Sequence, residues 1–141
     1  MDEQKKKVLE FIRSQELGVI SAVTPAGLPE AAVIGISEMD DLSLIFGTFN
    51  TYRKYKNIKA NQNVAFVIGW GNATIQYEGV ARELEGSERE EAKQIHTKKS
   101  PHSAKFGDLA EQHFFKVTPK WIRYTDYSRD SVYGDVFELK F

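Results

Sequence analysis

A series of short apolar runs, separated by turn-forming residues, most restricts the fold that this chain can adopt. The runs at 17–23 and 30–37 are rich in β-branched residues and flank the sequence TPAGLP. Proline and glycine in that connection predict a turn, so the two runs are expected to form a β-hairpin. Later runs of similar character predict strands at 43–48, 63–70, 72–85, 114–117, 121–126 and 132–141.

Three minor helices accompany these strands. Apolar residues recur at helical spacing within 3–14, which predicts an amphipathic helix. Residues 52–61 lack the alternation of a strand and predict a short helix. The sequence SERE at 87–90 matches a capping box, which predicts a polar surface helix over 88–98, and residues 99–112 are expected to form an irregular or partly helical connection.

About six to seven short strands at close spacing predict a mainly β fold with minor α content. This pattern favours an antiparallel barrel over a sandwich or a βαβ sheet, and closure of a barrel removes exposed strand edges. No repeat or linker divides the chain, so residues 1–141 are expected to form a single domain.

Composition excludes several classes of function. The hydrophobic (41%) and charged (28%) fractions are those of a globular protein, so disorder is not expected. A net charge of -1 gives no electrostatic reason to expect a nucleic-acid partner. The chain has no cysteine, no signal-peptide pattern and no stretch apolar enough to span a bilayer, so we expect a cytoplasmic protein without a membrane partner.

The segment FGTFNTYRKYKNI at 46–58 carries the clearest chemical signal. Arg53 and Lys54, with a third cation two residues later, fall in the first turns of the predicted helix. A helix N-terminus is already partly positive, so each cation there should cost a few tenths of a kcal/mol. A bound phosphate would reverse this cost by accepting bonds from the free amides, the Thr48 and Thr51 hydroxyls and the two cations. A basic surface turn with Thr51 as an ordinary N-cap explains the local pattern equally well.

Two glycines within predicted strands also carry information. Gly35 interrupts an apolar strand, which is typical of a close ligand approach or of a bend in a barrel. Gly79, in the longest predicted strand, is expected to mark a bulge or a close backbone approach.

The order of these features resembles the pyridoxamine 5'-phosphate oxidase superfamily, the split β-barrels that bind flavin mononucleotide (FMN). The resemblance covers residues 17–85 well and the later strands loosely. The matching pieces are GLP at 27–29, AVIGIS at 32–37, FGT at 46–48, YRK at 52–54, VAFV at 64–67 and YEGVA at 77–81.

The resemblance implies a homodimer with FMN at its two-fold interface. Arg53 and Lys54 would hold the phosphate, with Gly47 and Thr48 nearby, and Thr74 would be a polar contact of the flavin. The backbone of Ala32, Val33, Ile34, Gly35 and Ile36 would run beside the isoalloxazine ring. Trp121 is a candidate from the partner chain, although an ordinary barrel aromatic explains it better.

Two departures argue against a vitamin B6 substrate. Ser37 stands where the pyridoxamine 5'-phosphate oxidases have a lysine, and the sequence ends VFELKF without their arginine-bearing C-terminal segment. The chain therefore resembles the smaller members of the superfamily more than the oxidases themselves.

These observations predict a flavin-dependent oxidoreductase acting on a small molecule, in which FMN carries out the electron or hydride transfer. No side chain is identified as catalytic, and the three histidines lack the spacing of metal ligands. Two alternatives stay open. One is a non-enzymatic flavin or haem carrier or sensor, and the other is a reductase that uses the deazaflavin F420 on the same fold.

Overall fold

The computed structural model describes residues 2–128, 132 and 134–141. Its elements, in chain order, are α1 (Glu3–Arg13), β1 (Leu17–Val23), β2 (Pro29–Gly35), β3 (Ser37–Glu38), β4 (Leu44–Phe49), α2 (Arg53–Ala60), β5 (Asn63–Ile68), β6 (Ala73–Glu83), α3 (Gly86–Lys99), the 3-10 helix η1 (Pro101–Phe106), β7 (Gln112–Asp126) and β8 (Asp135–Lys140).

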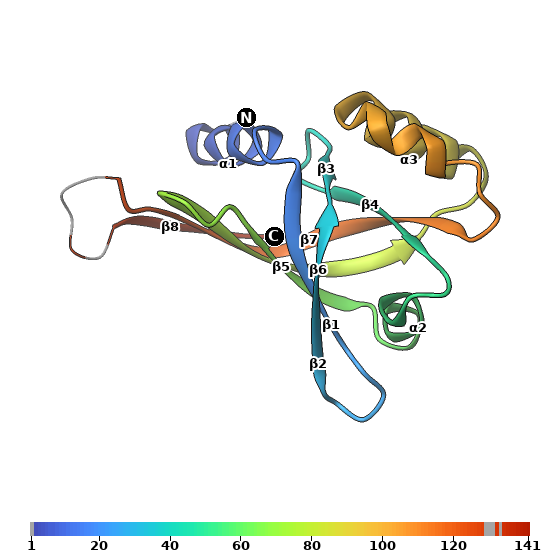
Figure 1. Cartoon of the computed structure of the whole chain (residues 1–141). Coiled ribbons are helices and arrows are strands. Elements are labelled where there is room, and N and C mark those ends of the chain that lie inside the picture. Colours follow the sequence, from blue (N-terminus) through green and yellow to red (C-terminus); the bar gives the residue numbers. More distant parts are fainter. Residues whose placement is uncertain (1, 129–131, 133) are drawn as a thin grey trace.

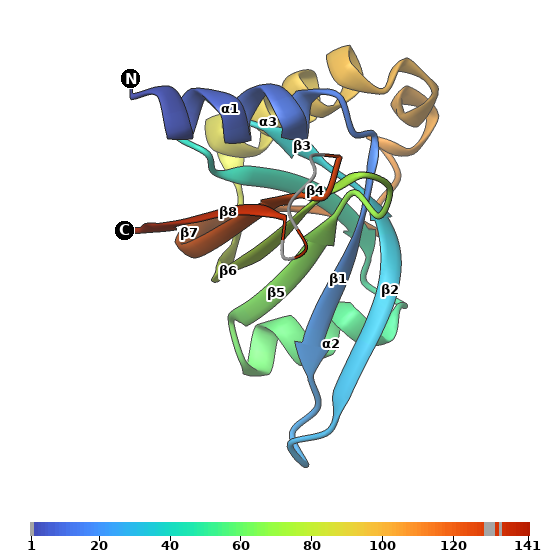
Figure 2. The ribbon, with the colours of Figure 1, turned by 90° about the vertical axis from the view of Figure 1, so that its left-hand side faces the viewer.

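All strands belong to one antiparallel sheet with the order β2-β1-β5-β6-β7-β4-β3, and β8 adds to β7. Figures 1 and 2 show the sheet curled into a half-barrel, with α1 and α3 across one end and α2 against the other. The predicted mainly β split barrel is confirmed, although the predicted strand 30–37 is divided between β2 and the two-residue β3.

The two predicted strands 114–117 and 121–126 are one continuous strand, β7. The prediction was wrong to leave residues 118–120 outside a strand; they include Pro119, which cannot donate a backbone hydrogen bond to a neighbouring strand. β7 pairs with β4 up to Val117 and with β8 from Trp121 onward. Pro119 lies between these two pairings, so no strand on that side requires its missing N–H.

The start of α3 also differs from the prediction. The helix begins at Gly86, and its N-cap residue Glu85 makes no side-chain hydrogen bond. The expected capping box does not form because the helix begins before Ser87, which therefore lies inside α3 and is not its N-cap; the Glu90 carboxylate lies 3.1 Å from the Lys93 ammonium. At the C-terminus, β8 covers Asp135–Lys140, and residue 133 of the predicted strand 132–141 lies outside the described residues.

The inner face of the half-barrel holds the main apolar core. Phe46 stacks on Phe115 with 5.2 Å between ring centroids, and Tyr77 is fully buried beside them with its hydroxyl donating to the Leu42 carbonyl at 2.8 Å. Val8 and Ile12 of α1 are fully buried and close one opening of the barrel. Within the described residues, no helix has the length and apolarity needed to cross a membrane.

Gly79 lies both at a bulge and at a close backbone approach, the two features that the sequence predicted for this position. The pairing register between β6 and β7 shifts between Glu78 and Gly79, which is the signature of a bulge. A Cβ atom at Gly79 would lie 2.5 Å from the Thr118 carbonyl oxygen, closer than real Cβ contacts come. The backbone of β7 therefore passes too near to allow a side chain at this position.

We expect Gly79→Ala to lower the free energy of unfolding by about 1–3 kcal/mol, because the new methyl group overpacks a rigid backbone contact. Gly71→Ala is the matched control, since a Cβ at Gly71 would meet nothing within 4 Å. The control should change stability by less than about 0.5 kcal/mol. Urea unfolding followed by tryptophan fluorescence measures both variants, and equal stability of the two would contradict the close approach.

Candidate functional site

Two adjacent cavities lie along the free edge of β2. One, of about 310 Å³, lies between β1, β2 and the N-terminus of α2. The other, of about 350 Å³, lies between β2, β4, α3 and η1. Tyr52 and Lys54 line both cavities, so the two are neighbours, and we call them together the β2 slot.

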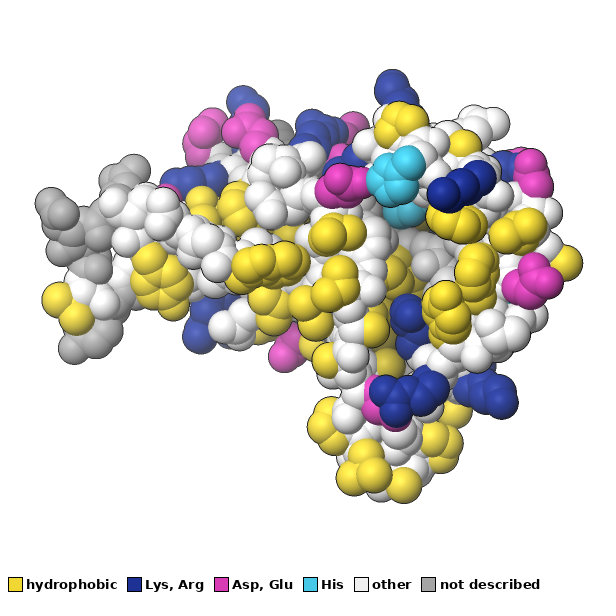
Figure 3. Space-filling view, viewed as in Figure 1, with side chains coloured by type: hydrophobic (Ala, Val, Ile, Leu, Met, Phe, Trp, Pro, Cys, Tyr) yellow, Lys and Arg dark blue, Asp and Glu magenta, His cyan; other side chains and the backbone are white. Residues whose placement is uncertain are grey.

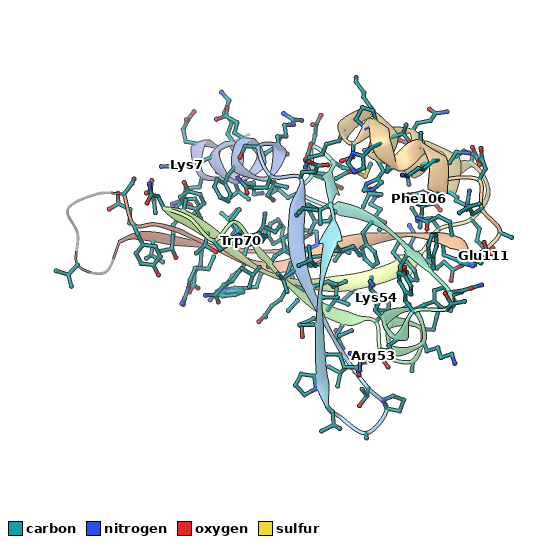
Figure 4. All side chains as sticks on the ribbon, in the orientation of Figure 1. Lys7, Arg53, Lys54, Trp70, Phe106 and Glu111 are labelled. Atoms are coloured by element: carbon teal, nitrogen blue, oxygen red, sulfur yellow. The ribbon has the colours of Figure 1, made fainter. Side chains whose placement is uncertain are left out.

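The figures show the surroundings of the β2 slot. In Figure 3, hydrophobic side chains border a hollow that has a cation at its lower end and a histidine above it. Figure 4 shows Lys54 from α2 and Phe106 from η1 on the same side of the β1–β2 hairpin, with Trp70 on its other side. Volumes of a few hundred Å³ fall within the usual range of roughly 300–1,000 Å³ for small-molecule sites.

Most of the predicted cofactor-binding residues line the β2 slot. They are Ala32, Val33, Ile34, Gly35, Gly47, Thr48, Arg53 and Lys54. Ile36 does not, because its side chain is fully buried in the core, and its N–H continues the β1–β2 pairing by donating to the Glu16 carbonyl.

Thr74 and Trp121 lie elsewhere, on the outer face of the sheet. Ile75 and Tyr77 are buried toward the core, so Thr74, on the alternate side of β6, points outward. Trp121 is paired with the outward-facing Glu78, and its indole N–H donates to Glu138 at 3.2 Å. Neither residue contacts the β2 slot within the chain.

The N-terminus of α2 has neither a capping side chain nor an acidic residue of its own. Tyr52 occupies the N-cap position and provides no side-chain hydrogen bond, and the first turn has no acidic residue. The alternative interpretation of Thr51 as an ordinary N-cap is therefore wrong. The end of α2 remains a place where an anion would be stabilised.

Arg53 already has a partner from its own chain. Its guanidinium lies 2.6 Å from the Glu30 carboxylate, which also accepts a bond from the Asn57 amide at 2.6 Å. Arg53 is largely exposed, whereas Glu30 is mostly covered. Glu30 has no local signal in the sequence, because only the curl of the sheet brings β2 beside α2.

Lys54 is the less compensated of the two cations. Its ammonium lies 4.8 Å from the centroid of the Tyr52 ring, and it forms no ion pair with the described residues. The pKa of Lys54 is lowered because burial partly removes the ammonium from water. A partly desolvated cation without a carboxylate is well suited to bind an anionic ligand.

The Thr48 hydroxyl adds an unsatisfied polar group to the β2 slot. Its oxygen is buried and has no hydrogen-bond partner within the described chain. Such orphaned groups are uncommon in native structures and require a reason. Thr48 lines the β2 slot, but its hydroxyl oxygen is covered by the chain itself, so a ligand would reach this oxygen only after the lining side chains move.

Aromatic rings form one wall of the β2 slot. Phe49 lies 5.3 Å from Tyr52 and 6.0 Å from Phe106, measured between ring centroids. Tyr52 is 50% exposed and Phe106 is 37% exposed, so both have free surface beside the slot. This arrangement suits a planar ring system, and η1, which supplies Phe106, was expected only as an irregular connection.

The sequence profile of the family described as pyridoxamine 5'-phosphate oxidase matches residues 4–126. The chain belongs to this family. Among curated proteins, none matches the sequence.

Solved structures agree with this assignment. A putative pyridoxamine 5'-phosphate oxidase from Listeria innocua has a TM-score of 0.74 and 22% identity, over 86% of this chain and 98% of that one. General stress protein 26 from Bacillus anthracis has a TM-score of 0.73 and 22% identity, over 98% of this chain and 100% of that one.

A haem-binding protein from Mycobacterium smegmatis is also similar. Its TM-score is 0.84 at 14% identity, over 99% of this chain, and this chain spans only 59% of its length. At these identities the likenesses show a shared fold and no more.

Glu83 anchors α2 beneath the β2 slot of this pyridoxamine 5'-phosphate oxidase family member. Its carboxylate accepts bonds from the Tyr55 hydroxyl at 2.8 Å, the Lys59 ammonium at 3.1 Å and the His113 ring at 2.9 Å. Burial alone would raise the pKa of Glu83, but these three bonds outweigh it and hold the pKa below its ordinary value. An ionised Glu83 therefore holds α2, the helix that carries Lys54, against β6 and β7.

We expect Glu83→Gln to lower stability at neutral pH by about 1–3 kcal/mol, since it removes hydrogen bonds to a charged group. Because the folded pKa is depressed, the contribution is complete above the ordinary value of 4.5 and disappears as the pH falls through the lower folded value. Urea unfolding of the native protein and of Glu83→Gln at decreasing pH should therefore show that the difference between their free energies of unfolding disappears in acid. Glu78→Gln, on the exposed outer face, is the control, and a pH-independent difference for Glu83→Gln would refute the assignment.

Proposed function

We propose that this protein binds FMN in the β2 slot and acts as a flavin-dependent oxidoreductase on a small molecule. The observation that carries the proposal is the unpaired, partly buried Lys54 at the uncapped end of α2, beside an aromatic-walled cavity along the edge of a strand. Membership of the pyridoxamine 5'-phosphate oxidase family supports it.

The phosphate of FMN fits the end of the slot at α2. The Lys54 ammonium and the free amides of the first turn would bind it, with the Thr51 hydroxyl beside them. Arg53 contributes less than the sequence implied, because Glu30 already neutralises it and would repel a phosphate. The local charge of two cations and one carboxylate remains positive.

The isoalloxazine ring fits the apolar end of the slot. The edge strand β2 offers backbone N–H and C=O groups that no second strand uses, the Thr48 hydroxyl is unsatisfied, and Phe106 can pack against a ring face. When bound there, the flavin would supply the electron or hydride transfer. The protein would bind it, orient it and exclude water.

A homodimer is part of the proposal. Val33, Val19 and Val67 are consecutive register partners on the outer face of β2, β1 and β5, and the exposed Trp70 follows β5. Val33 is 61% exposed and also lines the β2 slot. A second copy that covers this apolar row would therefore border the cofactor as well.

A second function, haem binding by a carrier, is favoured by one observation. The ring of His96 lines the β2 slot, and histidine is a common haem ligand. An absorption spectrum of the purified protein separates the two cofactors. Mass spectrometry of the released molecule further separates FMN from F420.

We expect Lys54→Gln to weaken FMN binding by about tenfold to a hundredfold, because it removes a charge-assisted bond to the phosphate. Riboflavin, which has the ring without the phosphate, should bind the variant and the native protein equally well. Fluorescence titration of apoprotein with each ligand gives both affinities. Lys56→Gln, on an exposed position of the same helix, should change neither.

Glu30→Gln should change FMN affinity in the opposite direction to Lys54→Gln. It removes the competing carboxylate and should strengthen FMN binding while leaving riboflavin binding unchanged. The double variant Arg53→Ala, Lys54→Ala should retain its fold and fail to retain FMN. Native-like FMN affinity in the double variant would remove the phosphate assignment.

Sedimentation velocity tests the dimer. The native protein should sediment at twice the mass of the 16.1 kDa chain, and Val67→Glu should dissociate it by placing a charge on the apolar row. Leu109→Glu is the matched control, because Leu109 (43%) and Val67 (40%) are similarly exposed but Leu109 lies outside the row. A monomeric native protein at micromolar concentration would refute the homodimer.

A further inference from the structure

His96 reaches the β2 slot from the last turn of α3. Lys99 fixes this end of the helix, because its ammonium binds the Glu38 carboxylate at 2.6 Å and the Ile12 carbonyl at 3.1 Å. His96 is buried, and its ring lies 6.3 Å from Phe114, measured between centroids. The ring is thus held between two strands and α3 in one orientation.

Ser37 determines which ring nitrogen of His96 carries the proton. The Ser37 hydroxyl lies 2.6 Å from the Nδ1 atom of His96, and Ser37 is completely buried. Within the described chain, this hydroxyl has no other hydrogen-bond partner. If Nδ1 carried the proton, the hydroxyl would be left with a buried and unused donor, which costs about 1–3 kcal/mol. The favoured arrangement has the hydroxyl donating to Nδ1.

The proton of His96 then resides on Nε2. Burial, with a further effect of Lys99 and His102, lowers the pKa of His96, so the ring is neutral at neutral pH and carries a single N–H. With Nδ1 acting as an acceptor, that N–H is on Nε2.

The Nε2 edge of His96 opens onto the β2 slot because residue 35 is glycine. A Cβ atom at Gly35 would lie 3.6 Å from Cε1 and 3.7 Å from Nε2 of His96, in ordinary contact. Any side chain there would therefore cover this edge of the ring. His96 and Gly35 both line the same cavity, and Nε2 has no hydrogen bond to the described residues.

We propose that His96 donates an Nε2–H hydrogen bond to a carbonyl oxygen or ring nitrogen of the bound flavin, and that Ser37 is the positioning residue that keeps His96 in this tautomer. The inference rests on the proposed FMN site and identifies which chemical feature of the ligand that site recognises. In this tautomer Nε2 presents a hydrogen-bond donor, and coordination of haem iron at Nε2 would first require the proton to move to Nδ1. The native tautomer is therefore suited to a ring with hydrogen-bond acceptors.

The tautomer is tested without any cofactor. Two-bond proton–nitrogen NMR spectra of the ¹⁵N-histidine-labelled apoprotein distinguish the two neutral forms, and His96→Gln assigns the His96 signals by their loss. We expect the Nε2–H form in the native protein and a growth of the Nδ1–H form in Ser37→Ala. An Nδ1–H ring in the native protein would overturn the proposal.

Ligand binding is tested with a matched pair of variants. His96→Gln keeps an N–H donor near the Nε2 position, whereas His96→Leu removes it. We expect His96→Leu to weaken FMN and riboflavin equally, by about twofold to tenfold, because the lost bond is to the ring. His96→Gln should restore most of this loss, and His102→Gln, at an exposed histidine outside the slot, should have no effect.

The reduction potential of the bound flavin gives a readout that a purely structural role would not change. The reduced ring is richer in electrons and accepts the stronger hydrogen bond, so His96→Leu should make the potential more negative and His96→Gln should not. If His96→Leu does not fold, Ser37→Ala tests the role of His96 instead, by the same measurements of ligand affinity and of the flavin reduction potential. Unchanged affinity and potential would refute the role of His96, whereas failure of the native protein to bind FMN or riboflavin would refute the proposed function itself.

Discussion

The pairing of β7 with three strands is the constraint on which the rest of the structure depends. β6 occupies one edge of β7 along most of its length, while β4 and then β8 share the other edge. β4 therefore diverges from β8 and curls toward the opposite end of the sheet, where β2 is the edge strand. The β2 slot is lined by β2 and β4, so it lies along the seam where the half-barrel fails to close. The split of the barrel provides both the cavity and an unpaired strand edge.

The electrostatics of that seam follow from which segments the curl brings together. Loop residues after β4 lead directly into α2, so the positive end of the helix lies at the mouth of the slot. β2 brings Glu30 to the same place, and this carboxylate neutralises Arg53 but not Lys54. If carboxylates neutralised both cations, the helix end would have no preference for an anion. If both cations were unpaired, their repulsion would destabilise the folded apoprotein. One paired and one unpaired cation is a compromise between stability and binding.

Local signals in the sequence were sufficient for the fold and for one end of the site. The hairpin around TPAGLP, the basic helix at 53–60 and the bulge at Gly79 each follow from neighbouring residues alone. The continuity of β7 could not be predicted locally, because the effect of Pro119 depends on which strand lies beside it, and the local sequence does not contain that information. Glu30, Phe106 and His96 were missed for the same reason, since each reaches the slot only through pairing or packing between distant segments.

Ser37 shows how a single position can change the chemistry of a shared fold. The resemblance implies a lysine here in the pyridoxamine 5'-phosphate oxidases, and a lysine in this place would bring a charge into a completely buried site. A charge so buried needs a partner, whereas the Ser37 hydroxyl and His96 satisfy each other without any net charge. The neutral pair leaves Lys54 as the unpaired cation of the described slot. Positive charge is then concentrated at the phosphate end, and the ring end is left apolar with neutral donors, a division that suits a ligand with one anionic end and one planar uncharged end.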